Sequence, residues 1–133
     1  AGALGQRLLH GGIGTDTQAT PQVIDNVLIV LANCPDTAVA DRIARTLVEQ
    51  RLAACANRLG QVDSIFRWQG AVERTVEVPL LIKTTRERYS EVEATIRALH
   101  PYDVPEIIAW PITDGLPAYL RWVVEETQPP MQA

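Results

Sequence analysis

The stretch that decides the fold is a pair of extended runs, AACANRLGQVDSIFRW at residues 53–68 and AVERTVEVPLLIKT at residues 71–84. Neither run has a helical period, and in the second run apolar and polar side chains alternate, as in a strand with one buried face. Gln69 and Gly70 join the runs, which predicts a hairpin. Gly60 predicts a kink. Pro79 has no backbone N–H and predicts a bulge or an unpaired edge position.

Outward from this hairpin, the sequence predicts two strands and three helices. NVLIVLANC at 26–34 is a β-branched run typical of a buried strand, and residues 37–50 carry apolar side chains at the spacing of an amphipathic helix. A second helix is predicted up to His100, starting where Thr84 and Glu87 have the spacing of a capping box. VPEIIAWPI at 104–112 predicts a fourth strand, and GLPAYLRWVVEET at 115–127 predicts a terminal helix with Pro117 in its first turn.

This order, β-α-β-β-α-β with a terminal helix, predicts an α+β fold of the ferredoxin-like type. Right-handed crossovers give one antiparallel sheet with strand order 4-1-3-2 and both helices on one face. The other face carries apolar side chains without a cover, so we expect self-association. The predicted domain spans 26–128, after a flexible leader at 1–25 and before a tail at 129–133.

Composition and motif content argue against several classes of function. A chain of 133 residues with a net charge of −4 lacks the basic face of a nucleic-acid binder, and no apolar run is long enough to cross a membrane. Two cysteines without CxxC spacing fit a reducing compartment, so we expect a cytoplasmic protein. The sequence has no nucleophile motif and no phosphate-binding glycine loop, which argues against an enzyme and against an organic cofactor.

HPYDVPE at 100–106 holds the one histidine of the predicted domain. Strand directions place it at the same end of the sheet as Cys34 and the hairpin at Trp68. An imidazole, the carboxylate of Glu106 and a thiol could there hold a late divalent metal, with copper(II) favoured by the Irving–Williams order. The alternatives are a hydrogen bond or helix-end contact for His100, an ion pair with Lys83 for Glu106, and simple burial for Cys34.

Five segments in unbroken order resemble one family. They are EQRLAACAN, SIFRWQGAVER, EVPLLIKT, HPYDVPEIIAWPI and YLRWV, and together they resemble the CutA divalent-ion tolerance family over roughly residues 27–127. The resemblance implies a tight homotrimer, divalent-metal binding with copper prominent, and a role in metal tolerance by binding or signalling. It also implies that His100 and Glu106 contact metal. Ala32 occupies the position of the family's cysteine, and Cys34 lies two residues, about 6.6 Å, further along the same strand face.

A second function class is a trimeric regulatory module that binds a small anionic effector or an unidentified partner protein in clefts between subunits. Tyr102, Trp68 and Lys83 are the candidate cleft residues. Tyr102 could hydrogen-bond a ligand or anchor the corner, and packing or an interface role is the favoured alternative for Trp68. A copper titration separates the two classes.

Overall fold

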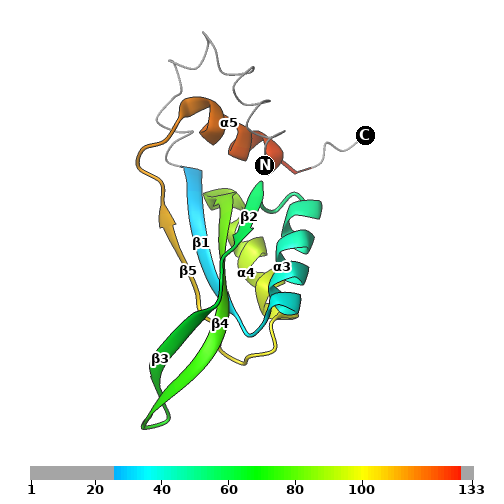
Figure 1. Cartoon of the computed structure of the whole chain (residues 1–133). Coiled ribbons are helices and arrows are strands. Elements are labelled where there is room, and N and C mark those ends of the chain that lie inside the picture. Colours follow the sequence, from blue (N-terminus) through cyan, green and yellow to red (C-terminus); the bar gives the residue numbers. More distant parts are fainter. Residues whose placement is uncertain (1–25, 130–133) are drawn as a thin grey trace.

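The described part of the chain, residues 26–129 of a computed structural model, contains one five-stranded antiparallel sheet and three α-helices (Figure 1). The expected leader at 1–25 and tail residues 130–133 lie outside it. The elements in chain order are β1 (Val27–Cys34), α3 (Thr37–Glu49), β2 (Cys55–Arg58), β3 (Val62–Trp68), β4 (Ala71–Thr85), the 3-10 helix η2 (Arg86–Arg88), α4 (Tyr89–Leu99), β5 (Ile107–Pro111) and α5 (Pro117–Glu126).

The strand order is β2-β4-β1-β5, with β3 also pairing β4. These are the expected neighbours, but the detail differs because the strand expected over 53–68 is divided into β2 and β3 around Gly60. Pro79 lies opposite this break, and its carbonyl accepts a hydrogen bond from the Leu59 N–H at 2.9 Å. In an antiparallel strand the N and C=O of one residue point the same way, so the proline nitrogen faces the break. The predicted kink at Gly60 is confirmed, whereas Pro79 is not at an unpaired edge position, because it lies in the central strand β4 and pairs with Asn33 of β1.

The β3–β4 hairpin extends beyond the body of the molecule (Figure 1). Trp68 pairs with Ala71 across a two-residue turn. Gln69 and Gly70 in that turn have φ angles of 50° and 83°. Positive φ at both central residues is the requirement of the tight hairpin turns whose twist matches that of the strands.

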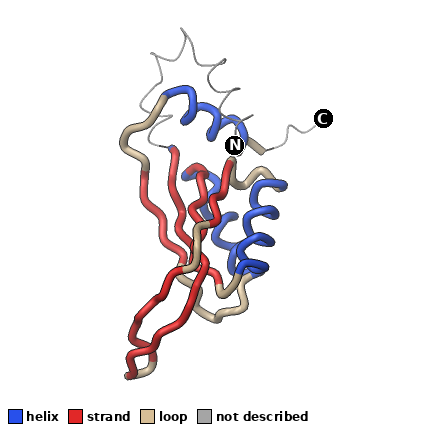
Figure 2. Tube along the Cα trace, viewed as in Figure 1, coloured by secondary structure: helices blue, strands red, loops and turns tan. Residues whose placement is uncertain are grey.

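The main core lies between the sheet and helices α3 and α4, which cover the same face (Figure 2). Alternate residues of β1 and β4 point into it, and they are Val30, Ala32, Cys34, Val78, Leu80 and Ile82. Ile43 and Leu47 of α3 and Ile96 of α4 are fully buried against them. Asp36 caps α3, because its Oδ1 accepts a hydrogen bond from the Val39 N–H at 2.9 Å.

The capping box predicted at Thr84 is wrong. Strand β4 continues to Thr85, which pairs with Val27 of β1, and α4 begins only at Tyr89 after η2. The Thr84 hydroxyl donates instead to the Leu52 carbonyl at 2.6 Å. Pairing with β1 therefore overrides a local signal for a helix start.

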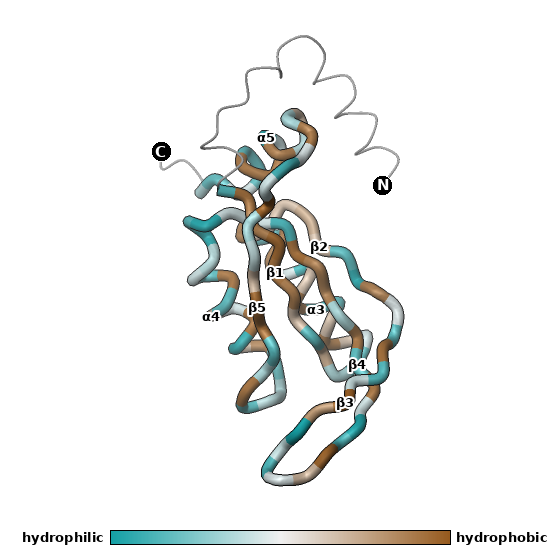
Figure 3. The backbone as a smooth tube through the Cα atoms, turned by 90° about the vertical axis from the view of Figure 1, so that its left-hand side faces the viewer, coloured by the Kyte–Doolittle hydropathy of each residue, from teal (hydrophilic) through white to brown (hydrophobic). Residues whose placement is uncertain are grey.

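The helix-free face of the sheet is apolar and only partly covered. Alternation places Ile29, Leu31 and Leu81 on this face, in register with β5 and β2. Helix α5 covers one end of the sheet, where Leu120 and Val123 pack in a second cluster. Ile108 and Trp110 of β5 remain 49% and 40% exposed. Figure 3 shows that apolar segments continue into the hairpin, where exposed apolar side chains recur.

Candidate functional site

His100 is buried at the end of α4 and holds the 100–106 corner in place. Its Nε2 lies 2.7 Å from the backbone carbonyl of Asn33, and its Nδ1 accepts a hydrogen bond from the Tyr102 N–H at 3.2 Å. Because Nδ1 accepts, Nε2 is the nitrogen that donates. Both ring nitrogens are therefore engaged. The rings of His100 and Tyr102 also lie 4.7 Å apart, centroid to centroid.

Asn33 connects His100 to Glu106. Its backbone carbonyl accepts from His100, and its side-chain amide donates to Glu106 Oε1 at 2.9 Å. The imidazole and the carboxylate thus lie at one rim, where strand directions had placed them. The sequence did not indicate Asn33 as the residue that joins them.

Cys34 is fully buried in the core at the end of β1. Burial, with smaller contributions from Asp36 and Glu77, raises the pKa of this thiol to about 11, so it stays protonated at neutral pH. A metal-binding cysteine needs the opposite environment, one that favours the thiolate. Residues 26–129 contain no group of three or more His, Cys, Asp or Glu side chains that could hold a metal ion. The three residues predicted as ligands therefore form no ready metal site within the described chain.

A pocket of about 680 Å³ lies beside this rim, between the hairpin and the 102–106 segment. Its lining is acidic and aromatic, and consists of Ser64, Ile65, Phe66, Trp68, Glu73, Glu77, Tyr102, Asp103, Val104 and Glu106. Four of these side chains are carboxylates and three are aromatic, and none is basic. An anionic ligand would meet repulsion here, whereas a cation would be attracted.

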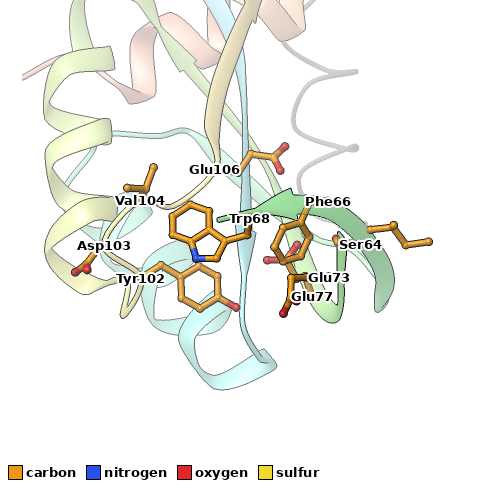
Figure 4. A pocket seen from close by; sticks show the side chains of 10 residues that line it. Ser64, Phe66, Trp68, Glu73, Glu77, Tyr102, Asp103, Val104 and Glu106 are labelled. Carbon is orange, nitrogen blue, oxygen red and sulfur yellow. The ribbon is translucent and has the colours of Figure 1, made fainter. Parts of the chain in front are cut away.

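The register of the β3–β4 hairpin places several of the pocket-lining side chains on one face. Phe66 pairs with Glu73, and residues two apart on β3 and β4 share a face, so Trp68 and Glu77 lie on the same side of the ribbon. In Figure 4 the rings of Phe66, Trp68 and Tyr102 gather around one space, with the Glu73 and Glu77 side chains beside Phe66. Two elements far apart in the sequence therefore form the pocket walls.

Glu77 is the most informative carboxylate of this lining. It is only 9% exposed, yet its carboxylate has no hydrogen bond or ion pair within residues 26–129. By contrast, Asp63 on the same hairpin is paired with Arg74 at 3.1 Å. The pKa of Tyr102 is raised, first by burial and then by the charges of Glu77, Asp36 and Cys34. The Glu77 carboxylate oxygens are not among the fully buried polar atoms without a hydrogen bond in residues 26–129, so they are open to the pocket, where a cation could reach them.

The structure brings Trp68, Tyr102 and Glu106 together in this pocket but places Lys83 elsewhere. Lys83 lies six residues beyond Glu77 on β4, about 20 Å along a strand at 3.3 Å per residue, and its Nζ donates to Asn57 Oδ1. It is therefore neither part of this pocket nor the partner of Glu106.

Sequence reasoning missed Glu77 as a site residue. The signal was present, since Glu77 precedes the apolar run VPLLI as Glu106 precedes IIAWPI. An acid that opens an apolar strand needs a partner or water.

A family model described as CutA1 divalent ion tolerance protein matches residues 28–126. The chain belongs to this family. The resemblance found in the sequence is thereby confirmed. The family is named for ion tolerance and not for a catalysed reaction.

Relatives within the CutA1 family match over most of the described chain. The divalent-cation tolerance protein CutA of Thermus thermophilus is 48% identical over 99 residues, which cover 74% of this chain and 96% of that protein. The CutA homolog of Xenopus laevis is 42% identical over 84% of this chain and 75% of its own length. The crystal structure of CutA from Xylella fastidiosa superposes with a TM-score of 0.76 at 43% identity, over 77% of this chain and 99% of that one.

Proposed function

We propose that this chain serves divalent-cation tolerance by binding divalent metal ions as a homotrimer, with copper(II) as the favoured metal. The observation that carries the proposal is Glu77, a residue only 9% exposed whose carboxylate has no hydrogen bond or ion pair within residues 26–129 and lines a pocket with three further carboxylates and no basic side chain. A bound cation would neutralise it. Relatives named for divalent-cation tolerance support the choice of a divalent metal as that cation.

Glu77 and Glu106 are the proposed metal contacts within one chain. Copper(II) is favoured because late divalent metals bind a given set of ligands in the Irving–Williams order. Water or a neighbouring subunit would complete the coordination, since the described residues supply no group of three ligands. His100 could join only by giving up its hydrogen bonds to Asn33 and Tyr102.

The protein is proposed to act by binding or signalling and not by turnover. His100 is the one histidine of residues 26–129, and both of its nitrogens are held in hydrogen bonds. It therefore has no free nitrogen with which to activate a nucleophile. The acidic lining of the pocket also favours a cation over the anionic effector of the alternative regulatory function.

The uncovered apolar surfaces support assembly. Ile108 and Trp110 are exposed on the helix-free face, and the hairpin carries exposed Ile65 and Val72 beyond the body. Contact between subunits through such surfaces would remove them from water. We expect sedimentation equilibrium to give about three times the chain mass of 14.7 kDa. A folded monomer at micromolar concentration would contradict the proposed assembly.

Calorimetric titration with copper(II) tests the metal site. We expect saturable binding by the wild-type protein and at least tenfold weaker binding by Glu77→Gln, a loss of about 1.4 kcal/mol. The matched control is Glu87→Gln, which removes an exposed carboxylate of η2 outside the pocket. Absence of saturable binding, or equal affinity of the Glu77 and Glu87 variants, would contradict the proposal.

A further inference from the structure

The aromatic side of the pocket is not explained by a metal ion. Phe66, Trp68 and Tyr102 line it and are 40%, 51% and 39% exposed. A metal ion needs a few oxygen, nitrogen or sulfur ligands at short distance, and aromatic carbon supplies none of them. A volume of about 680 Å³ lies within the range of sites for small organic molecules.

We propose that this pocket also binds an organic ammonium cation, with its charged head at Glu77 and its alkyl part against Phe66, Trp68 and Tyr102. The inference rests on the cation-attracting pocket of the proposed function and adds a second class of ligand to it. Ammonium groups are attracted both to carboxylates and to the faces of aromatic rings, most strongly to tryptophan. Val104 adds apolar surface for an alkyl chain.

One wall of this pocket is held in position before any ligand binds. The Tyr102 backbone N–H donates to His100 Nδ1, and the two rings lie 4.7 Å apart. Glu106, at the other end of the segment, is held by Asn33. Less ordering is therefore needed on binding, which favours affinity. His100 acts here as a positioning residue for the aromatic wall.

A small molecule is a better source of the ammonium group than a second copy of the chain. Lys83 is the single lysine in the sequence, and its Nζ already donates to Asn57. An arginine of a neighbouring copy is the competing occupant. If it filled the pocket, the assembled protein would bind no added amine.

Calorimetric titration of the assembled protein with n-hexylammonium tests the inference, with 1-hexanol as the uncharged ligand of matched length. We expect one hexylammonium per chain and at least tenfold weaker binding of hexanol. Glu77→Gln should weaken hexylammonium at least tenfold, and Glu87→Gln should leave it unchanged.

The aromatic contribution needs its own variants. Trp68→Leu should weaken hexylammonium about fivefold, within the range of a cation–π contact, and should leave copper affinity within twofold of the wild type. Phe66→Leu provides a second test if Trp68→Leu alters assembly, which sedimentation would detect. Equal loss of copper and hexylammonium in both variants would overturn the assignment of the aromatic rings.

The two proposals fail in different ways. Copper binding without any preference for hexylammonium over hexanol would overturn the ammonium site and leave the proposed function intact. Hexylammonium binding that is lost in Glu77→Gln, in a protein that does not bind copper, would support the ammonium site and contradict the proposed function. No hexylammonium binding by the assembled protein would overturn the inference.

Discussion

Replacement of His100 by alanine distinguishes a structural role of this residue from a role as a metal ligand. The substitution removes the hydrogen bond to the Asn33 carbonyl, the acceptor for the Tyr102 N–H and the ring of a residue that is only 6% exposed. Each hydrogen bond contributes about 0.5–1.5 kcal/mol, and the cavity left by the ring adds about 1 kcal/mol or more. We therefore expect His100→Ala to lower the free energy of unfolding by about 2–4 kcal/mol.

The matched variant is His100→Gln. Its side-chain amide can reach the Asn33 carbonyl as a donor, in place of Nε2, but it offers no acceptor at the position of Nδ1 for Tyr102. We expect it to lose about half as much stability as His100→Ala. This intermediate stability would assign about half of the loss in His100→Ala to the contact with Asn33.

Urea unfolding at neutral pH measures both variants, at one fixed chain concentration because assembly contributes to apparent stability. If His100→Ala is as stable as the wild type within about 0.5 kcal/mol, the buried hydrogen-bonded role of His100 is refuted. If that variant also loses copper binding, His100 is a metal ligand in solution, as the sequence resemblance implies.

Four further predictions concern other parts of the molecule. Buried Cys34, with its pKa raised to about 11, should resist iodoacetamide at pH 8 in the native protein while partly exposed Cys55 reacts, and rapid labelling of both would contradict this. The pKa of this thiol is about 9.0 in the unfolded chain and about 11 in the folded one, so the free energy of unfolding of the wild type relative to Cys34→Ala should be constant below pH 9 and should fall by about 2–3 kcal/mol as the pH rises towards 11. A difference in urea unfolding that does not depend on pH would contradict this prediction. Gly70→Ala, at φ 83°, should cost about 1 kcal/mol by the same method, whereas Gly60→Ala, with equally open surroundings and no positive φ, should cost less; equal losses would remove the turn argument. Ile108→Asp should shift sedimentation from the assembled species towards the monomer, and an unchanged mass would exclude the helix-free face from the interface.

Much of the fold was predictable because local patterns and strand pairing agree. Periodicity predicted the strands and helices, and Gly60 predicted a kink at the place where the structure divides the expected strand into β2 and β3. At Thr84 the local pattern and the strand pairing disagree. Its spacing from Glu87 favoured a helix cap, but pairing with β1 makes it part of strand β4. Non-local pairing of that kind is not visible in a short window of sequence.

The site was predictable in place but not in detail. Strand directions correctly placed His100, Glu106 and Trp68 at one end of the sheet. Burial and hydrogen bonding, however, depend on three-dimensional packing. Only the structure shows that both ring nitrogens of His100 are in hydrogen bonds and that Cys34 lies in the core. For the same reason Glu77 emerged only once the hairpin and the 102–106 segment were seen as two walls of one pocket.

The most direct test of the cation pocket is diffraction at the copper absorption edge from crystals soaked in copper(II). We expect an anomalous peak within ligand distance of the Glu77 carboxylate and of Glu106 or a residue of a neighbouring subunit, while His100 keeps its contacts with Asn33 and Tyr102. A peak bound by Cys34 and a reoriented His100, with the Glu77 pocket empty of metal, would contradict it.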